Sequence, residues 1–226
     1  MASLDLGKRS SEALEPQILA LTEKEVVVLK PPGMPAQADE TGDVDMLRWA
    51  EAQLRERLHL VHRIDRPVGG VMLFARGPRS AAEWTRRFKN SQVRKTYLAI
   101  TEPEVYPPFG ELRHYIEKDA KRHRAKVYYK THPNAALAIL RYQTLAVRDG
   151  KSLVVVEPQT GRFHQIRAQL SELGSPIVGD VKYGYPPPAP DPRSIALWAW
   201  KLENWAALPP LHAYPWSLFP ELTSLK

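Results

Sequence analysis

The 226-residue chain contains no cysteine. This absence excludes disulfide bonds, zinc sites built from thiolates and every mechanism with a cysteine nucleophile. Long apolar runs are also missing: no stretch approaches the ~20 residues that cross a membrane, and the first residues lack the apolar core of a secretory signal. We therefore expect a cytoplasmic protein that makes no membrane contact.

Metal-ligand patterns are equally scarce. His59 and His62 are three residues apart, but no third ligand follows at a recognised spacing, and the HExxH pattern of zinc hydrolases is absent. We therefore expect a protein that works without a metal.

Positive charge is concentrated in the middle of the chain. The 32 Lys and Arg residues outnumber 25 Asp and Glu residues, which gives a net charge of +7 with neutral histidines. Residues 1–59 carry 7 basic and 11 acidic side chains, whereas residues 60–100 carry 9 and 2, and residues 111–130 carry 7 and 3. Such a region attracts polyanions and is typical of nucleic-acid-binding proteins, although a solvated charged face has the same composition.

Short strand-like runs outnumber helical patterns. Apolar runs at 136–147 and 151–157 flank Asp149-Gly150, which predicts a β-hairpin. Other strands are expected at 25–30, 71–75 and 96–101, and helices from Asp43 or Asp45 to about residue 57, at 80–88 with Ala81, Trp84 and Phe88 facing inward, and at 163–173. Because the helices do not alternate regularly with the strands, we expect an α+β fold: a mostly antiparallel mixed sheet with flanking helices.

Three segments place polar side chains beside apolar runs or turn residues: His62–Pro67, Arg94–Ala99 and Thr160–Arg167. In the first, Asp65 lies among arginines in a loop bounded by proline and glycine. Nearby positive charge keeps a carboxylate ionised, and therefore nucleophilic or basic. The structural alternative is an ion pair that caps the turn.

The third segment begins with a turn that starts a helix. Its polar side chains, Arg162, His164, Gln165 and Arg167, therefore lie near a helix N-terminus. Free N–H groups and a partial positive charge at that end suit an anionic partner. A basic first turn of a surface helix gives the same pattern. Tyr97 lies in the 96–101 strand close to Lys95, a placement that usually indicates a core residue.

Taken together and in this order, these segments resemble the pseudouridine synthases of the RluA family. VVVLKPPGMP resembles the family's opening VxxKPxG strand and loop, VHRIDRPVGGVMLFAR its HRLDxxTSG segment, and KTYLAI its KxYxA strand. EPQTGRFHQIRAQLSELGSPIVGDVKYG is similar to TGRxHQIRxHxxxxGHPIxGDxxYG. The resemblance runs from about residue 17 to about residue 205 and rests on four ordered motifs.

This resemblance implies the pseudouridine synthase fold with a central catalytic cleft. It also implies conversion of specific uridines in structured tRNA or rRNA to pseudouridine, after base flipping and without a cofactor or metal. Asp65 matches the family's catalytic aspartate, Tyr97 the tyrosine that packs on the target base, and Arg167 the arginine that pairs with the aspartate. Contacts to RNA are expected from His62, Arg63, Arg66, Lys95, Arg162, His164 and Gln165.

The sequence also departs from the family pattern. Val68-Gly69-Gly70 replaces TSG, Gln169 and Ser175 replace histidines, and Leu197-Trp198-Ala199 replaces LHA. We expect these changes to tune the catalytic loop and the choice of RNA, with the activity retained. We also expect residues 1–16 to form an N-terminal extension and residues 17–226 a single, monomeric catalytic domain with no separate N-terminal RNA-binding domain.

Two other functions compete with this interpretation. One is a catalytically inactive RNA-binding or chaperone protein with the same fold, against which the intact Asp65, Tyr97 and Arg167 argue. The other is a nuclease that uses Asp65 and His62. It would need a metal cluster or an acid–base pair that the sequence does not offer.

Overall fold

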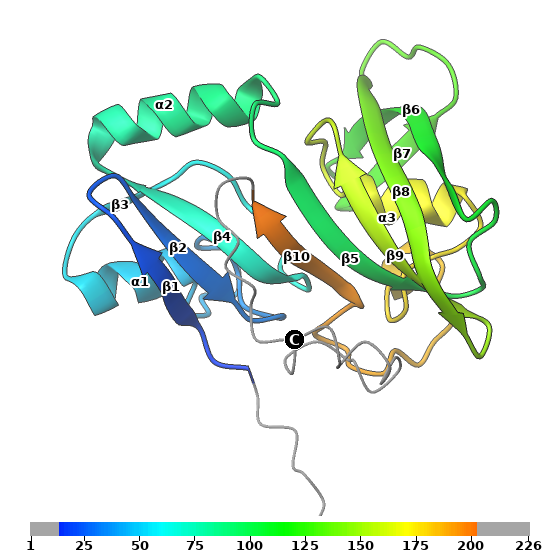
Figure 1. Cartoon of the computed structure of the whole chain (residues 1–226), viewed down its shortest axis with the longest axis horizontal. Coiled ribbons are helices and arrows are strands. Elements are labelled where there is room, and N and C mark those ends of the chain that lie inside the picture. Colours follow the sequence, from blue (N-terminus) through cyan, green and yellow to red (C-terminus); the bar gives the residue numbers. More distant parts are fainter. Residues whose placement is uncertain (1–13, 203–226) are drawn as a thin grey trace, which may run out of the picture.

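The computed structural model describes residues 14–202 (Figure 1). Within this range, ten strands form one sheet in the order β1-β2-β4-β10-β5-β9-β8-β6-β7, with β3 paired to β4. The strands are β1 (Gln17–Leu21), β2 (Glu25–Lys30), β3 (Leu58–Leu60), β4 (Gly69–Arg76), β5 (Lys95–Thr101), β6 (Phe109–Asp119), β7 (Arg124–Tyr128), β8 (Ala136–Arg148), β9 (Lys151–Pro158) and β10 (Leu197–Leu202). The helices are α1 (Met46–Leu54), α2 (Gly77–Lys89) and α3 (Gln165–Glu172), with a short 3-10 turn, η1 (Val181–Tyr183).

The sheet is mixed because of one strand. Neighbouring strands pair antiparallel, except that β10 runs parallel to β4 while pairing antiparallel with β5. The last strand along the described chain therefore lies in the middle of the sheet and joins its two halves (Figure 1). The expected α+β fold with a mostly antiparallel mixed sheet is confirmed. Most of the expected 1–16 extension and the last 24 residues of the expected domain lie outside the described range.

Strands β2 and β4 are buried on both faces. Val26 and Val28 of β2 belong to the apolar cluster that includes Met46 of α1, whereas Val27 belongs to a second cluster that includes Trp84 of α2. Helices thus cover both sides of this half of the sheet. This is why both strands read as continuous apolar runs instead of alternating patterns.

The expected hairpin is β8–β9. Asp149 (φ 49°) and Gly150 (φ 74°) both have positive φ, the backbone conformation that a tight hairpin turn requires. Strands β8 and β9 continue the sheet from β5 towards β6 and β7, and α3 packs against β6, β7 and β9. This half of the sheet holds the basic 111–130 region.

The expected helices are present with shifted ends. Asp45, not Asp43, is the N-cap of α1, and its carboxylate accepts a hydrogen bond from the Arg48 N–H at 3.0 Å. The expected 163–173 helix begins later, at Gln165, because His164 adopts the left-handed conformation (φ 49°), which excludes Phe163 from the helix. Strands β1, β6, β7 and β10 have no counterpart among the sequence-based expectations, whereas β3 overlaps the strand-like Leu60-Val61.

Candidate active site

The two halves of the sheet border a cavity of about 710 Å³. It is lined by the loop before β4, the end of α2, β5 and the loop that leads into α3, and the expected catalytic residues Asp65, Tyr97 and Arg167 all line it. They lie on three separate elements, so the fold brings together side chains up to 102 positions apart in the sequence. Part of the basic region, Lys95 and Lys118, also faces the cavity.

Asp65 lies in the irregular segment between β3 and β4. The backbone there turns, with the Val68 N–H donating to the Asp65 carbonyl at 3.0 Å, and this turn presents the carboxylate to the cavity. The side chain is 25% exposed. One of its oxygens, Oδ2, is 3.3 Å from Arg167 Nη1 and 3.7 Å from His164 Nε2. The carboxylate is thus held on one side by groups from the α3 region and remains accessible from the cavity.

Arg167 also binds a second carboxylate, that of Asp180, which the sequence analysis did not predict. Its Nε and Nη2 donate to Asp180 Oδ2 and Oδ1 at 2.7 and 2.8 Å, and the Asp180 side chain is only 1% exposed. The expected pairing of Arg167 with Asp65 exists, but the two-pronged contact belongs to Asp180. These charges hold the pKa of Arg167 above its usual value despite burial, which acts to lower it. Asp180 thereby aims the remaining nitrogen, Nη1, at Asp65.

Tyr97 and Lys95 share one face of β5, since side chains two residues apart in a strand point the same way. Both line the cavity and are half-buried. Burial, reinforced by the negative charge of Asp65, raises the pKa of Tyr97, so its phenol is neutral. Burial lowers the pKa of Lys95. The site therefore presents an aromatic ring and a lysine side chain beside the carboxylate.

His164 is held in a fixed position by its neighbours. Its ring stacks on Phe163 with a centroid distance of 3.8 Å, and its Nδ1 lies 2.9 Å from the hydroxyl oxygen of Tyr183. Burial, and then the positive charge of Arg167, lower the pKa of His164 to about 3. The imidazole is therefore neutral near pH 7. It faces the Asp65 carboxylate as a neutral polar group, not as a cation.

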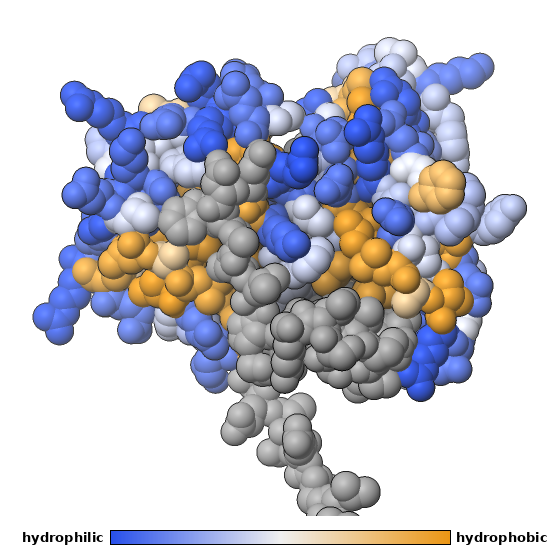
Figure 2. Space-filling model, in the orientation of Figure 1, coloured by the Kyte–Doolittle hydropathy of each residue, from blue (hydrophilic) through white to orange (hydrophobic). Residues whose placement is uncertain are grey.

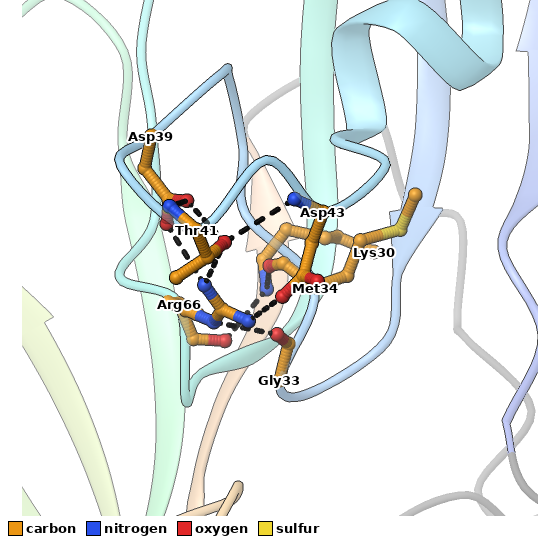
Figure 3. Close-up of polar contacts among 7 residues, drawn as sticks. All are labelled: Lys30, Gly33, Met34, Asp39, Thr41, Asp43 and Arg66. Atoms are coloured by element: carbon orange, nitrogen blue, oxygen red, sulfur yellow. Dashed lines mark hydrogen bonds and ion pairs between the residues drawn. The ribbon is translucent and has the colours of Figure 1, made fainter.

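The loop that carries Asp65 is fastened to the loop after β2 (Figure 3). The buried Lys30 donates from Nζ to the carbonyls of Pro31, Met34 and Arg66 at 2.9, 2.7 and 3.1 Å. The Arg66 carbonyl also accepts from the Gly33 N–H at 2.9 Å. Burial lowers the pKa of Lys30 to about 7, while the negative charge of Asp65 opposes that shift. Lys30 thus holds the backbone next to Asp65 in place.

The sequence matches the family described as RNA pseudouridylate synthase over residues 24–172, two-thirds of the chain. This chain belongs to the RNA pseudouridylate synthase family. Relatives include "tRNA pseudouridine synthase C" of Yersinia pestis, 32% identical over 74% of this chain and 70% of the relative. Another is "Ribosomal large subunit pseudouridine synthase C" of Rickettsia conorii, 39% identical over 55% of this chain and 41% of the relative. An uncharacterized RNA pseudouridine synthase of Haemophilus influenzae is 34% identical over 57% of this chain.

Solved structures of pseudouridylate synthases share the fold. Human RNA pseudouridylate synthase domain containing 4 is 27% identical, with a TM-score of 0.67 over 82% of each chain. Human RNA pseudouridylate synthase domain containing 1 has a TM-score of 0.70 at 23% identity, over 87% of this chain and 80% of the human one. The chain spans about half the length of several curated relatives, 55% of the Haemophilus influenzae protein and 41% of the Rickettsia conorii protein.

Two departures from the RluA-type pattern touch each other in this member of the family. Gly69, which stands where the pattern has serine, pairs in register with Trp198, which stands where the pattern has histidine. A Cβ on Gly69 would lie 2.3 Å from Cζ3 and 2.7 Å from Cε3 of the Trp198 ring. The absence of a side chain at position 69 therefore leaves room for the larger ring of Trp198, and strands β4 and β10 remain paired.

The expected RNA-contact residues divide into two groups. Six line the cavity: His62, Arg63, Lys95, Arg162, His164 and Gln165. Arg66 instead faces the other loop, where it donates from Nε to the Gly33 carbonyl at 2.9 Å and pairs with Asp39 at 3.0 Å and with Asp43 (Figure 3). Arg66 and its two carboxylate partners are therefore not among the residues that line the cavity.

Four of the six cavity residues are also engaged internally: His164 contacts Tyr183, Arg162 Nε donates to the Leu137 carbonyl at 2.9 Å, and Gln165 and His62 bond to the surrounding backbone. Gln165 is 4% exposed, and its amide bonds to the Thr160 hydroxyl, the Arg162 N–H and the Ile139 carbonyl. His62 Nε2 accepts from the Leu73 N–H at 2.9 Å. These contacts brace the backbone around the cavity, and direct contact of these residues with RNA stays a prediction.

Residues 14–202 contain neither a metal-ligand cluster nor a membrane-spanning helix. No group of three or more His, Asp or Glu side chains in that range is arranged to hold a metal ion. No helix described there is long and apolar enough to span a bilayer.

Proposed function

We propose that this protein isomerises specific uridines in structured RNA to pseudouridine, with Asp65 as the catalytic residue. The observation that carries the proposal is the accessible Asp65 carboxylate, held at 3.3 Å by Arg167 in a cavity that also contains Tyr97. The names of the relatives, which include tRNA and ribosomal large subunit pseudouridine synthases, support tRNA or rRNA as the substrate.

The reaction needs no external reactant. The bond between C1′ of the ribose and N1 of uracil breaks, a bond from C1′ to C5 forms, C5 loses a proton and N1 gains one. Asp65 acts on the ribose, either by attacking C1′ or by removing a proton from the sugar. Arg167 orients the carboxylate through their ion pair.

The target uracil must leave its stacked position to reach Asp65. Extrusion of a base costs a few kcal/mol, which stacking on an aromatic ring and contacts to phosphates offset. Tyr97 supplies the ring, and its neutral phenol places no charge against the base. Tyr97→Phe should therefore bind RNA as well as the parent, whereas Tyr97→Ala should lose both affinity and turnover, as filter binding and turnover assays would report.

The basic middle of the chain supplies the phosphate contacts. The last turn of α2 carries Arg86, Arg87 and Lys89, and the β6–β7 hairpin carries the exposed Lys121 and Arg122. Hydrophilic side chains gather over both of these regions, on either side of a notch between the two halves (Figure 2). A structured RNA that spans the notch would place one nucleotide over the cavity.

Tritium release from RNA labelled at C5 of uridine tests the proposal. The parent protein should release tritium from tRNA or rRNA, and Asp65→Asn should reduce release to background while RNA binding persists, because an amide is neither a useful nucleophile nor a base. Asp149→Asn is a matched control, since this residue lies in the exposed β8–β9 turn and its side chain is 85% exposed. Release by a folded Asp65→Asn protein would contradict the role of Asp65. Binding without release by the parent would indicate an inactive RNA-binding protein, and chain cleavage a nuclease.

We also propose that residues 17–226 act as one catalytic domain and that the protein is a monomer. The continuous sheet from β1 to β10 supports the single domain. Light scattering that gives the mass of two chains would contradict the monomer.

A further inference from the structure

Tyr183 is a buried residue to which neither the sequence motifs nor the comparisons assign a role. We infer that Tyr183 is a positioning residue whose hydroxyl fixes the tautomer of His164, so that the imidazole presents Nε2–H to the Asp65 carboxylate. The inference rests on the proposed function, because it concerns how the catalytic carboxylate is held. It adds a neutral donor to the arginine that the family pattern already provides.

The hydroxyl of Tyr183 lies between two partners. The side chain is at the end of η1 and is 2% exposed. Its oxygen accepts a hydrogen bond from the Ala125 N–H of β7 at 2.6 Å and lies 2.9 Å from His164 Nδ1. No other partner for this hydroxyl is present among residues 14–202.

These contacts determine which atoms carry the hydrogens. The Ala125 amide can only donate, so the hydroxyl oxygen is its acceptor, and the hydroxyl hydrogen must then find an acceptor of its own. His164 Nδ1 is the acceptor within reach. If Nδ1 carried a hydrogen, the buried hydroxyl hydrogen would have no partner in the described part of the chain, which is unfavourable. Nδ1 is therefore bare, and a neutral imidazole carries its hydrogen on Nε2.

The other side of the ring agrees with this assignment. Nε2 lies 3.7 Å from Asp65 Oδ2, so its hydrogen faces a carboxylate, whereas the opposite tautomer would set a lone pair against that oxygen. Arg167 Nη1 approaches the same oxygen at 3.3 Å. Oδ1 of Asp65 has no hydrogen-bond or ion-pair partner in residues 14–202. Arg167 therefore donates to Oδ2, the Nε2–H of His164 faces the same oxygen, and Oδ1 is left for the substrate.

The structure offers a clean substitution. The ring of Tyr183 also packs against Arg167, with the guanidinium carbon 5.0 Å from the ring centroid. Tyr183→Phe keeps this packing and removes the hydroxyl, and with it the acceptor of the Ala125 N–H. Tyr185→Phe is a matched control, since Tyr185 lies two residues further along and its hydroxyl donates to Glu102 at 3.3 Å.

The first measurement needs neither RNA nor activity. Long-range proton–nitrogen NMR of the free protein labelled on histidine, with the His164 signal assigned by its loss in His164→Gln, reports which ring nitrogen carries the hydrogen. The parent and Tyr185→Phe should show hydrogen on Nε2, and Tyr183→Phe should show a mixture of the two tautomers. Hydrogen on Nδ1 in the parent, or an unchanged pure tautomer in Tyr183→Phe, would overturn the inference.

The second measurement is turnover. Tyr183→Phe should lower kcat about tenfold with little change in KM, because a loosened orienting contact affects the reacting geometry more than RNA binding. Tyr185→Phe should leave both constants unchanged. If the parent is active and Tyr183→Phe has an unchanged kcat, this inference is overturned while the proposed function stands. An inactive parent would overturn the proposed function and, with it, the positioning role.

Discussion

The contact between Gly69 and Trp198 predicts that these two positions are coupled. A serine at position 69 would place its Cβ 2.3 Å from the Trp198 ring and 3.0 Å from Cδ of Pro32. The ring is 4% exposed and lies in the central strand β10, so it has little room to move. Overpacking of a core usually costs 1–3 kcal/mol, and we expect Gly69→Ser to reach the upper end, about 3 kcal/mol. For a chain of this size, that lowers Tm by about 6–12 °C.

A smaller ring at position 198 should relieve the clash. Trp198→His alone removes much of a buried aromatic side chain and should cost about 2–3 kcal/mol, somewhat less than truncation to alanine. In the double variant, the histidine leaves space for the serine. We therefore expect its loss of unfolding free energy to be about 2 kcal/mol smaller than the sum of the two single losses, within the range seen for residues in contact.

Urea unfolding of the parent, the two single variants and the double variant measures the coupling. Gly161→Ser is the matched control, because a Cβ there would approach only Lys95 Nζ, at 3.4 Å, and stability should change little. If the losses of unfolding free energy in the two single variants add up to the loss in the double variant within about 0.5 kcal/mol, the packing argument is refuted, because independent sites behave that way. So would a Gly69→Ser protein as stable as the parent.

Three further predictions concern charge. Asp180→Asn should lower the unfolding free energy by about 3 kcal/mol, because it leaves the buried Arg167 guanidinium without its charged partner. It should also lower turnover. An unchanged urea midpoint and an unchanged kcat would contradict this prediction. RNA affinity should fall steeply with salt, each neutralised phosphate adding about 0.7–0.9 to the slope of log K against log salt, and a flat response in filter binding would remove the electrostatic interface. Burial, and then the charge of Lys95, lower the pKa of His62 to about 3. Between about pH 6.5 and pH 3, His62 therefore binds a proton in the unfolded chain but not in the folded chain. Stability should fall as the pH drops through this window, and His62→Gln should make the fall shallower in urea titrations at pH 7 and pH 4.5.

The sequence predicted the features that depend on local chemistry. The Asp149-Gly150 turn adopts positive φ at both residues, as such a dipeptide favours, and the buried strands β2 and β4 follow from unbroken apolar runs. The family resemblance placed Asp65, Tyr97 and Arg167 together, and all three line one cavity.

What the sequence missed depends on contacts between distant segments. Asp180 reads as part of a turn, and nothing in its neighbourhood shows that both of its oxygens bind Arg167. Strands β6 and β7 carry many charged residues because one face of that part of the sheet is exposed, so their apolar pattern is weak. The central place of β10 is a matter of topology, which periodicity does not encode.

The place of β10 has a consequence for synthesis on the ribosome. Asp65 precedes β4 on one side of this strand, whereas Tyr97 lies on β5 on the other side. Within residues 14–202, β10 (residues 197–202) is the last strand to emerge, so the two halves of the nascent sheet lack the strand that joins them until β10 has been made. A nascent chain that ends before residue 197 contains Asp65, Tyr97 and Arg167 but lacks the central strand that lies between the two halves. The order of the strands therefore predicts that the two sides of the cavity come together only after β10 has left the ribosome.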